Sequence, residues 1–167
     1  PFYGNINNLA IWDTALTEEQ IQSHMSGEFS GEEEGLAAYW KFNSGEGETL
    51  YDHSGNANHG TINGASWGLP ATPGENNSLS FDGQDDYVDF GDLPSGLNSF
   101  SYMGWYKFPG LIGADDVNPI INTPNGAVMF SGDGQSLLGS AYISRDGISP
   151  FYEVGTSSYG ELNEWNH

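Results

Sequence analysis

The chain of 167 residues has no cysteine and almost no basic side chains. The absence of cysteine excludes a disulfide framework, a thiolate metal site and a cysteine nucleophile. Lysine and arginine occur only as Lys41, Lys107 and Arg145, against 23 acidic residues, so the formal net charge is −20. Nucleic acids and anionic membrane surfaces are bound through clustered cations. We therefore expect neither of them as a partner.

Long hydrophobic runs are also missing. No apolar segment approaches the ~20 residues that cross a bilayer, so no membrane insertion is expected. The chain opens on Pro1 without a charged-then-apolar leader, as expected of a processed form or a fragment. A strongly acidic surface suits a salty, cation-rich exterior, where screening relieves self-repulsion. This favours a secreted or cell-surface location; the alternative is that the acidity only aids solubility.

Apolar and aromatic residues are plentiful, at 37% and 14%, which is enough for a packed core. The 24 glycines separate short apolar segments, as in all-β domains with many turns. This pattern predicts a sandwich or jelly roll. The expected strands are 6–12, 36–42, 59–63, 78–82, 86–90, 99–108, 118–122, 126–130, 138–143 and 150–154.

One segment near the N-terminus has a helical pattern. Thr17 is followed three residues later by Gln20, which is the spacing of a capping box. Acidic residues fill the first turn and His24 lies near the last, as the helix dipole favours. We therefore expect one short helix over 17–24.

Several longer stretches resemble a known family. GLAAYWKFNSGEGETLYDHSGNANHGTINGASW at 35–67, SLSFDGQDDYVDFGD at 78–92 and SFSYMGWYKF at 99–108 resemble the opening elements of a LamG-like (concanavalin A-like lectin/glucanase) domain. LNEWNH at 162–167 resembles a mid-domain strand, and FYGNINNLAIWDTALTEEQIQ at 2–22 resembles the closing strand and trailing turn. The resemblance implies an antiparallel jelly-roll β-sandwich, in a family that mixes binding, adhesive and structural modules.

In this chain, the stretch that resembles the end of a LamG-like domain comes before the stretches that resemble its beginning. Residues 1–26 would be the closing strand and short helix of a preceding LamG-like unit, 27–35 an acidic linker, and 36–167 a sandwich that is incomplete at its C-terminal end. We favour a piece of a tandem-repeat protein. The alternatives are that strand 2–12 completes another copy, giving head-to-tail assembly, or that it closes its own domain.

The densest polar segment is YDHSGNANHG at 51–60. Asp52, Asn56 and their neighbours could offer oxygen atoms to Ca²⁺, or could satisfy their own backbone in an ordinary turn. The LamG resemblance implies a structural calcium between this loop and the closing strand, where Asn7 or Asn8 stands at a position that is commonly Asp. The candidate calcium ligands are therefore Asp52, Asn56 and Asn7.

A second acidic segment, FDGQDDYVDFGD at 81–92, raises the question of catalysis. Glycosidases use paired carboxylates, but Asp85 and Asp86 are adjacent and would point to opposite faces of a strand. We favour a hairpin turn at Asp82-Gly83 with solvated acids. Lectin-fold glucanases carry E-x-D-x-E or E-x-D-x-x-E on one strand, and the chain has neither pattern. No enzyme activity is therefore expected.

The aromatic residues divide into core and surface candidates. Trp40 and Trp105 fall inside strand patterns and are expected in the core. Trp67 falls in a loop, and Tyr152 and Tyr159 lie near later loops. Because exposed aromatic faces stack on sugar rings, these three are the candidate contacts for a glycan or a protein.

Together these features predict a non-catalytic extracellular module that binds a glycan or a surface protein. The alternative is a structural subunit that assembles with other copies of itself by donating strand 2–12. A glycoside hydrolase of lectin fold is a third reading, and its motif is absent.

Overall fold

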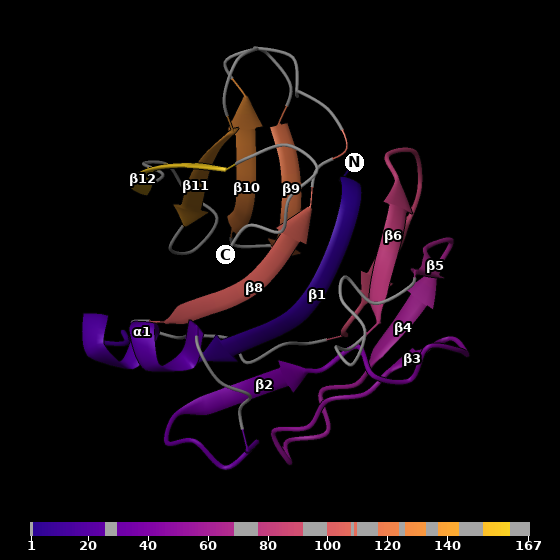
Figure 1. Cartoon of the computed structure of the whole chain (residues 1–167), viewed down its shortest axis with the longest axis horizontal. Helices are drawn as coiled ribbons and strands as arrows, with labels where there is room; N and C mark the ends of the chain where they lie inside the picture. Colours follow the sequence, from indigo (N-terminus) through magenta and orange to yellow (C-terminus); the bar gives the residue numbers. More distant parts are fainter. Residues whose placement is uncertain are drawn as a thin grey trace. The chain divides into compact units, whose positions relative to one another are not determined.

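The computed structural model describes residues 2–25, 30–68, 77–91, 100–107 and 109, and the backbone of four later strands. The described residues form one helix and twelve strands (Figure 1). In chain order these are β1 (Tyr3–Trp12), α1 (Glu18–Met25), β2 (Leu36–Trp40), β3 (Thr49–Leu50), β4 (Gly60–Asn63), β5 (Ser66–Gly68), β6 (Ser78–Asp82), β7 (Tyr87–Asp89), β8 (Ser101–Lys107), β9 (Val117–Thr123), β10 (Gly126–Gly132), β11 (Leu137–Ile143) and β12 (Tyr152–Gly160).

The strands form three sheets. The first has the order β2-β1-β6-β5, with β8 paired to β1; the second is β12-β11-β10-β9; the third is β3-β4-β7. Every pairing whose register is known is antiparallel. The expected all-β class with one short N-terminal helix is confirmed. The described residues fall into two units, one with those between 5 and 80 and between 87 and 106, the other with 2–4, 81–86 and those described from 107 onwards.

Strand β1 is the element on which the first sheet is built, because it pairs with β2, β6 and β8. Its partner β2 is buried along its whole length. Trp12 and Trp40, one on each of these strands, are fully buried. Fully burying a large apolar side chain stabilises a fold by about 1.5–3 kcal/mol, so these two strands anchor the core.

The strand expected over 36–42 is shorter than predicted. It ends at Trp40, and Phe42 adopts a φ of 57°, which lies outside the strand region. Of the two tryptophans expected in the core, Trp40 is completely buried and Trp105 is only partly buried.

The helix prediction is confirmed by its capping hydrogen bonds. The backbone N–H of Thr17 donates to Gln20 Oε1 at 2.9 Å, and the N–H of Gln20 donates to Thr17 Oγ1 at 3.3 Å. These bonds satisfy two of the orphan donors at the start of α1. At its other end the His24 ring stacks on Trp12, with ring centroids 5.3 Å apart. Among the described residues, no helix has the length and apolar content to cross a membrane.

Two strands were not expected from the sequence, namely β3 and β5. Trp67, predicted to lie in a loop, is in β5, where it pairs with Leu79 of β6. Neighbouring glycines obscure the strand pattern of β5 in the sequence. In addition, its pairing partner β6 lies more than ten residues further along the chain. Tyr152 and Tyr159, predicted near loops, both lie in β12, where they pair with Ile143 and Leu138.

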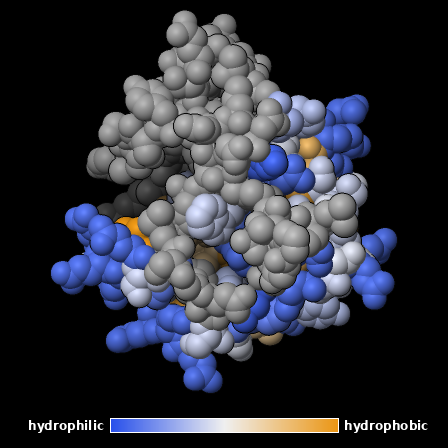
Figure 2. Space-filling model, in the orientation of Figure 1, coloured by the Kyte–Doolittle hydropathy of each residue, from blue (hydrophilic) through white to orange (hydrophobic). Residues whose placement is uncertain are grey.

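Hydrophilic residues cover most of the coloured surface in the view of Figure 2. This matches a chain with a net charge of −20. The exposed large hydrophobic side chains of the described residues are few, and three of the four are tyrosines. They are Tyr3, Ile21, Tyr51 and Tyr87.

Candidate functional site

The polar segment after β3 forms a turn around the carboxylate of Asp52. Asp52 is only 8% exposed and forms an isolated bridge with Trp40 of β2. Its Oδ1 accepts the backbone N–H groups of Tyr39 and Ser54, each within 2.9 Å. Its Oδ2 accepts the N–H of Asn58 and the hydroxyl of Ser54, both at 2.9 Å. The carboxylate therefore joins β2 to both ends of the turn.

The amide side chains of the same turn hold it against β2. Asn56 Nδ2 donates to the carbonyls of Leu36 and Ala37, and Asn58 Nδ2 also donates to Ala37. In return, the indole Nε1 of Trp40 donates to the carbonyl of Asn58 at 2.8 Å. These bonds satisfy buried polar groups that would otherwise destabilise the core.

The same hydrogen bonds determine the acidity of Asp52. Burial alone would raise the pKa of its carboxyl group, because burial disfavours the charged form. The backbone N–H groups of Tyr39, Ser54 and Asn58 and the Ser54 hydroxyl outweigh that effect and lower the pKa below its ordinary value. Asp52 is thus held as a carboxylate.

The fit of calcium to the predicted ligands can be judged from these contacts. A carboxylate has about four acceptor positions, and four donors already occupy those of Asp52. Asn7 is buried on β1, and its Oδ1 has no hydrogen-bond partner among the described residues. The two side chains flank β2, because Trp40 pairs with Leu9 on one side and with Asp52 on the other.

The amide nitrogen of Asn56 is engaged as well, because it donates to carbonyls of β2. Calcium at Asp52 therefore stays a prediction that requires the carboxylate to exchange hydrogen bonds for the ion.

Two histidines adjoin the Asp52 turn. The Nδ1 of His59 accepts the backbone N–H of Asp52 at 3.0 Å. His53 Nε2 is buried without a hydrogen-bond partner among the described residues. Burial, and then the charge of Lys41, lower the pKa of His53. The His59 ring is thus a hydrogen-bond acceptor of the turn, whereas the His53 ring packs edge-on against Tyr39, with centroids 6.4 Å apart.

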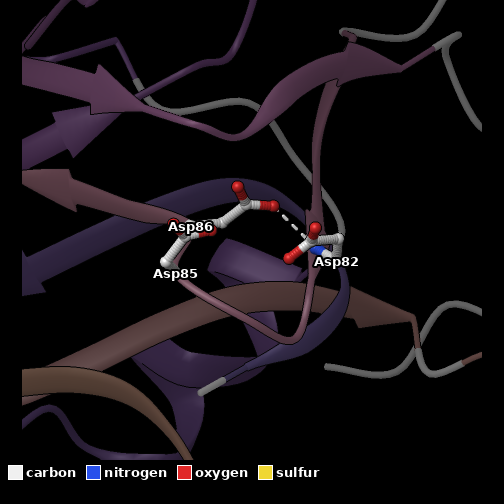
Figure 3. A group of neighbouring side chains, drawn as sticks. All are labelled: Asp82, Asp85 and Asp86. Carbon is white, nitrogen blue, oxygen red and sulfur yellow. Dashed lines mark hydrogen bonds between the residues drawn. The ribbon is translucent and has the colours of Figure 1, made fainter.

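A second acidic turn lies between β6 and β7 and has the opposite character. Asp82, Asp85 and Asp86 each bring one carboxylate oxygen within 4.8 Å of the others (Figure 3). Asp82 and Asp85 are exposed and Asp86 is partly buried. The N–H of Asp82 donates to Asp86 Oδ2 at 2.6 Å, and the N–H of Gln84 donates to Asp82 Oδ1 at 2.8 Å. Exposed carboxylates gathered in this way can bind a metal ion.

This turn corrects two of our expectations. Asp85 and Asp86 do not alternate across a strand, because both lie between the strands. Nor is the turn a hairpin: β6 pairs within the first sheet, whereas β7 pairs with β4 in the third. The turn at Asp82-Gly83 itself is confirmed. Gly83 has a φ of 77°, and a side chain there would meet the Cβ of Tyr3 at 3.0 Å.

The described part of the predicted acidic linker, residues 30–35, contains a turn held by Glu33. Glu33 Oε1 accepts the N–H of Ser30 at 2.7 Å, and Oε2 accepts the N–H of Gly31 at 3.0 Å. Burial raises the pKa of Glu33, but these hydrogen bonds prevail and lower it overall. The carboxylate acts as a local turn acceptor.

The aromatic candidates are placed differently from one another. Trp67 is partly buried, and its Nε1 donates to the carbonyl of Gly47 at 2.8 Å. Tyr152 and Tyr159 are located only by their backbone in β12. Tyr51 and Tyr87 are exposed but are not among the aromatic contacts predicted from the sequence. A signal was present for Tyr87, because alternation over 86–90 placed it opposite Val88.

Comparisons with protein-family models, with curated proteins and with solved structures find no significant match to this chain.

Proposed function

We propose that the chain is a non-catalytic extracellular binding module with a LamG-like jelly-roll sandwich, and that its ligand is a glycan or a surface protein. The observation that carries the proposal is the composition of its exposed apolar side chains. Tyr3, Tyr51 and Tyr87 are each more than half exposed, while Trp12, Trp40 and Tyr39 are buried. Tyrosine offers a flat apolar face and a polar tip, which suits recognition of sugars and of protein surfaces.

Two of the described carboxyl groups are suited to structural rather than catalytic roles. A glycosidase needs a carboxyl group with a raised pKa to protonate the leaving oxygen. In the described part of the chain, Glu33 and Asp52 have pKa values that are lowered instead. Both are also engaged by backbone donors, which suits them to structural roles.

A glycan array tests this proposal, together with an assay for released reducing sugar. We expect the wild-type chain to retain a defined set of glycans and to release no reducing sugar from them. Retention of no glycan and of no surface protein would contradict a binding module. Release of sugar would assign the protein to the hydrolases.

A second candidate is a structural subunit that assembles by donating β1. Its basis is that β1 pairs with three strands of its own chain, so the same strand donated by another copy would complete a whole sheet. Light scattering and negative-stain microscopy distinguish the candidates. Long filaments that disappear on deletion of residues 1–26 would establish the structural subunit, whereas a monodisperse small particle supports the binding module.

A further inference from the structure

The three-stranded sheet β3-β4-β7 has one buried and one exposed face. Leu50 and Ile62 are buried on its inner face, and a side chain at Gly60 would clash with Val88 at 2.5 Å. The Phe90 ring, just beyond β7, packs on Trp40 with centroids 4.2 Å apart. One face of the sheet is therefore closed by the core, and the other is available to a ligand.

The register of the strands decides which side chains share the exposed face. Thr49, Thr61 and Asp89 are paired across the three strands and form one row. Asn63 and Tyr87 form the next row, two residues further along. Tyr51, next to buried Leu50, extends this face in the other direction, where its ring meets His59 at 5.4 Å. We call these residues the outer face: Thr49, Tyr51, Thr61, Asn63, Tyr87 and Asp89.

The two tyrosines stand at opposite corners of the outer face. Tyr51 is 51% exposed and Tyr87 is 56% exposed. Four residues along β4 and two strand spacings separate them, or about 17 Å between Cα atoms at the usual rise and spacing of strands. Thr61 and Asp89, both exposed, lie between them. A single sugar ring cannot reach both tyrosines, but an extended chain of a few sugars can.

The polar groups of the outer face favour a ligand without negative charge. None of its residues is cationic, and the chain as a whole carries a net charge of −20. Its hydroxyl and carboxylate oxygens accept hydrogen bonds, which sugar hydroxyls donate. The negative face of a tyrosine ring likewise suits the positively polarised C–H groups of a pyranose. A uronate or sulfated chain would meet only repulsion here.

We propose that the outer face binds one extended chain of a neutral polysaccharide, with Tyr51 and Tyr87 each stacking on a sugar ring. Thr61 and Asp89 accept hydrogen bonds from the sugar hydroxyls between the two rings. The Oδ1 of Asp89 is fixed by the N–H of Gly91 at 2.9 Å, which orients the carboxylate. This inference rests on the proposed function and specifies its ligand class and its site.

Affinity electrophoresis in gels that contain a soluble β-glucan, mannan, galactan or polyuronate tests the proposal. The variants are Tyr51→Ala and Tyr87→Ala, with Tyr87→Phe as the conservative substitution. Tyr3→Ala is the matched control, because Tyr3 is 53% exposed but lies on β1, outside this sheet. Exposed tyrosines tolerate alanine, so unchanged thermal unfolding of each variant verifies the fold.

We expect a neutral polysaccharide to retard the wild-type chain. Tyr51→Ala and Tyr87→Ala should each weaken this binding by about tenfold, while Tyr87→Phe and Tyr3→Ala should retain it. Wild-type affinity in both alanine variants of the outer face would overturn the inference. Binding of the polyuronate alone, or of a protein alone, would also overturn it but leave the proposed function standing; no binding to any glycan or surface protein would end both.

Discussion

The two acidic turns of the molecule make an instructive comparison. Around Asp52, one buried carboxylate receives four hydrogen bonds from the protein. Between β6 and β7, three carboxylates crowd together and are mostly exposed. In its sequence the first turn resembles a metal-binding site, but in the structure hydrogen-bond donors of the protein itself occupy the carboxylate oxygens of Asp52. The second turn has three carboxylates, and the hydrogen bonds that Asp82 and Asp86 accept come from residues of the same turn. The two turns therefore differ in how many hydrogen-bond donors surround each carboxylate, rather than in how many acidic residues they contain.

The largest expected effect comes from removing the buried carboxylate. Asp52→Ala leaves the N–H groups of Tyr39 and Asn58 without their acceptor, so we expect a loss of about 2–4 kcal/mol in the free energy of unfolding. Asp52→Asn keeps Oδ1 but opposes the N–H of Asn58 with a second donor, and it should lose roughly half as much. Urea unfolding measures both. A loss below about 0.5 kcal/mol for Asp52→Ala would mean that solvent replaces these bonds.

Acidification should remove the stabilising contribution of the Asp52 carboxylate. The pKa of Asp52 is lower in the folded chain than its ordinary value of 3.8. Its stabilising contribution is therefore present above about pH 4 and is lost as the pH falls through the folded value. The stability difference between wild type and Asp52→Asn should shrink as the pH falls below 4. A difference that stays constant from pH 7 to pH 3 would contradict the assignment.

Chelation tests where any calcium binds. Because the oxygens of Asp52 are already occupied, EDTA should change the melting temperature of wild type and Asp52→Asn by the same amount. If calcium contributes to the melting temperature, the change caused by EDTA should instead disappear in the double variant Asp85→Asn/Asp86→Asn. An EDTA effect that is lost in Asp52→Asn would place the ion at Asp52, as the LamG resemblance implies. No EDTA effect in any variant would leave both turns free of calcium.

The smallest effect concerns repulsion within the exposed cluster. Asp85→Asn removes one of three neighbouring charges, so we expect a gain of about 0.2–0.5 kcal/mol at low ionic strength. The gain should vanish in 1 M NaCl, whereas the cost of Asp52→Asn should persist because its partners are buried. Urea unfolding at the two salt concentrations measures this. A destabilising Asp85→Asn would show that the cluster already holds a cation.

The parts of the fold that could be predicted are those set by local sequence. The capping box at Thr17 predicted α1, and apolar runs predicted most strands. Strand β5 could not be predicted, because Trp67 is defined as a strand residue only by its pairing with Leu79. The turn character of 51–60 was evident in its Asp, Asn and Gly residues. The burial of Asp52 depends on Trp40, and no local pattern reveals it.

The candidate site was less predictable than the fold. Alternation predicted that Tyr87 and Asp89 share a face opposite Val88, and the burial of these residues confirms it. Tyr51 follows a strand of only two residues, which is too short to show a period. Asp82 lies beside Asp85 and Asp86 because the turn between them is closed by the hydrogen bond from the N–H of Asp82 to Asp86 Oδ2. The sequence predicted the turn at Asp82-Gly83 but not this contact.

The most direct test of a binding module is the glycan array performed with wild type, Asp52→Asn and Asp85→Asn/Asp86→Asn at a temperature where all three are folded. We predict that all three retain the same glycans, because the buried turn maintains the fold and the carboxylates of Asp85 and Asp86 lie outside the outer face. Reducing sugar should not be released. Absence of any retained glycan or surface protein from the wild-type chain, or release of sugar, would contradict this function.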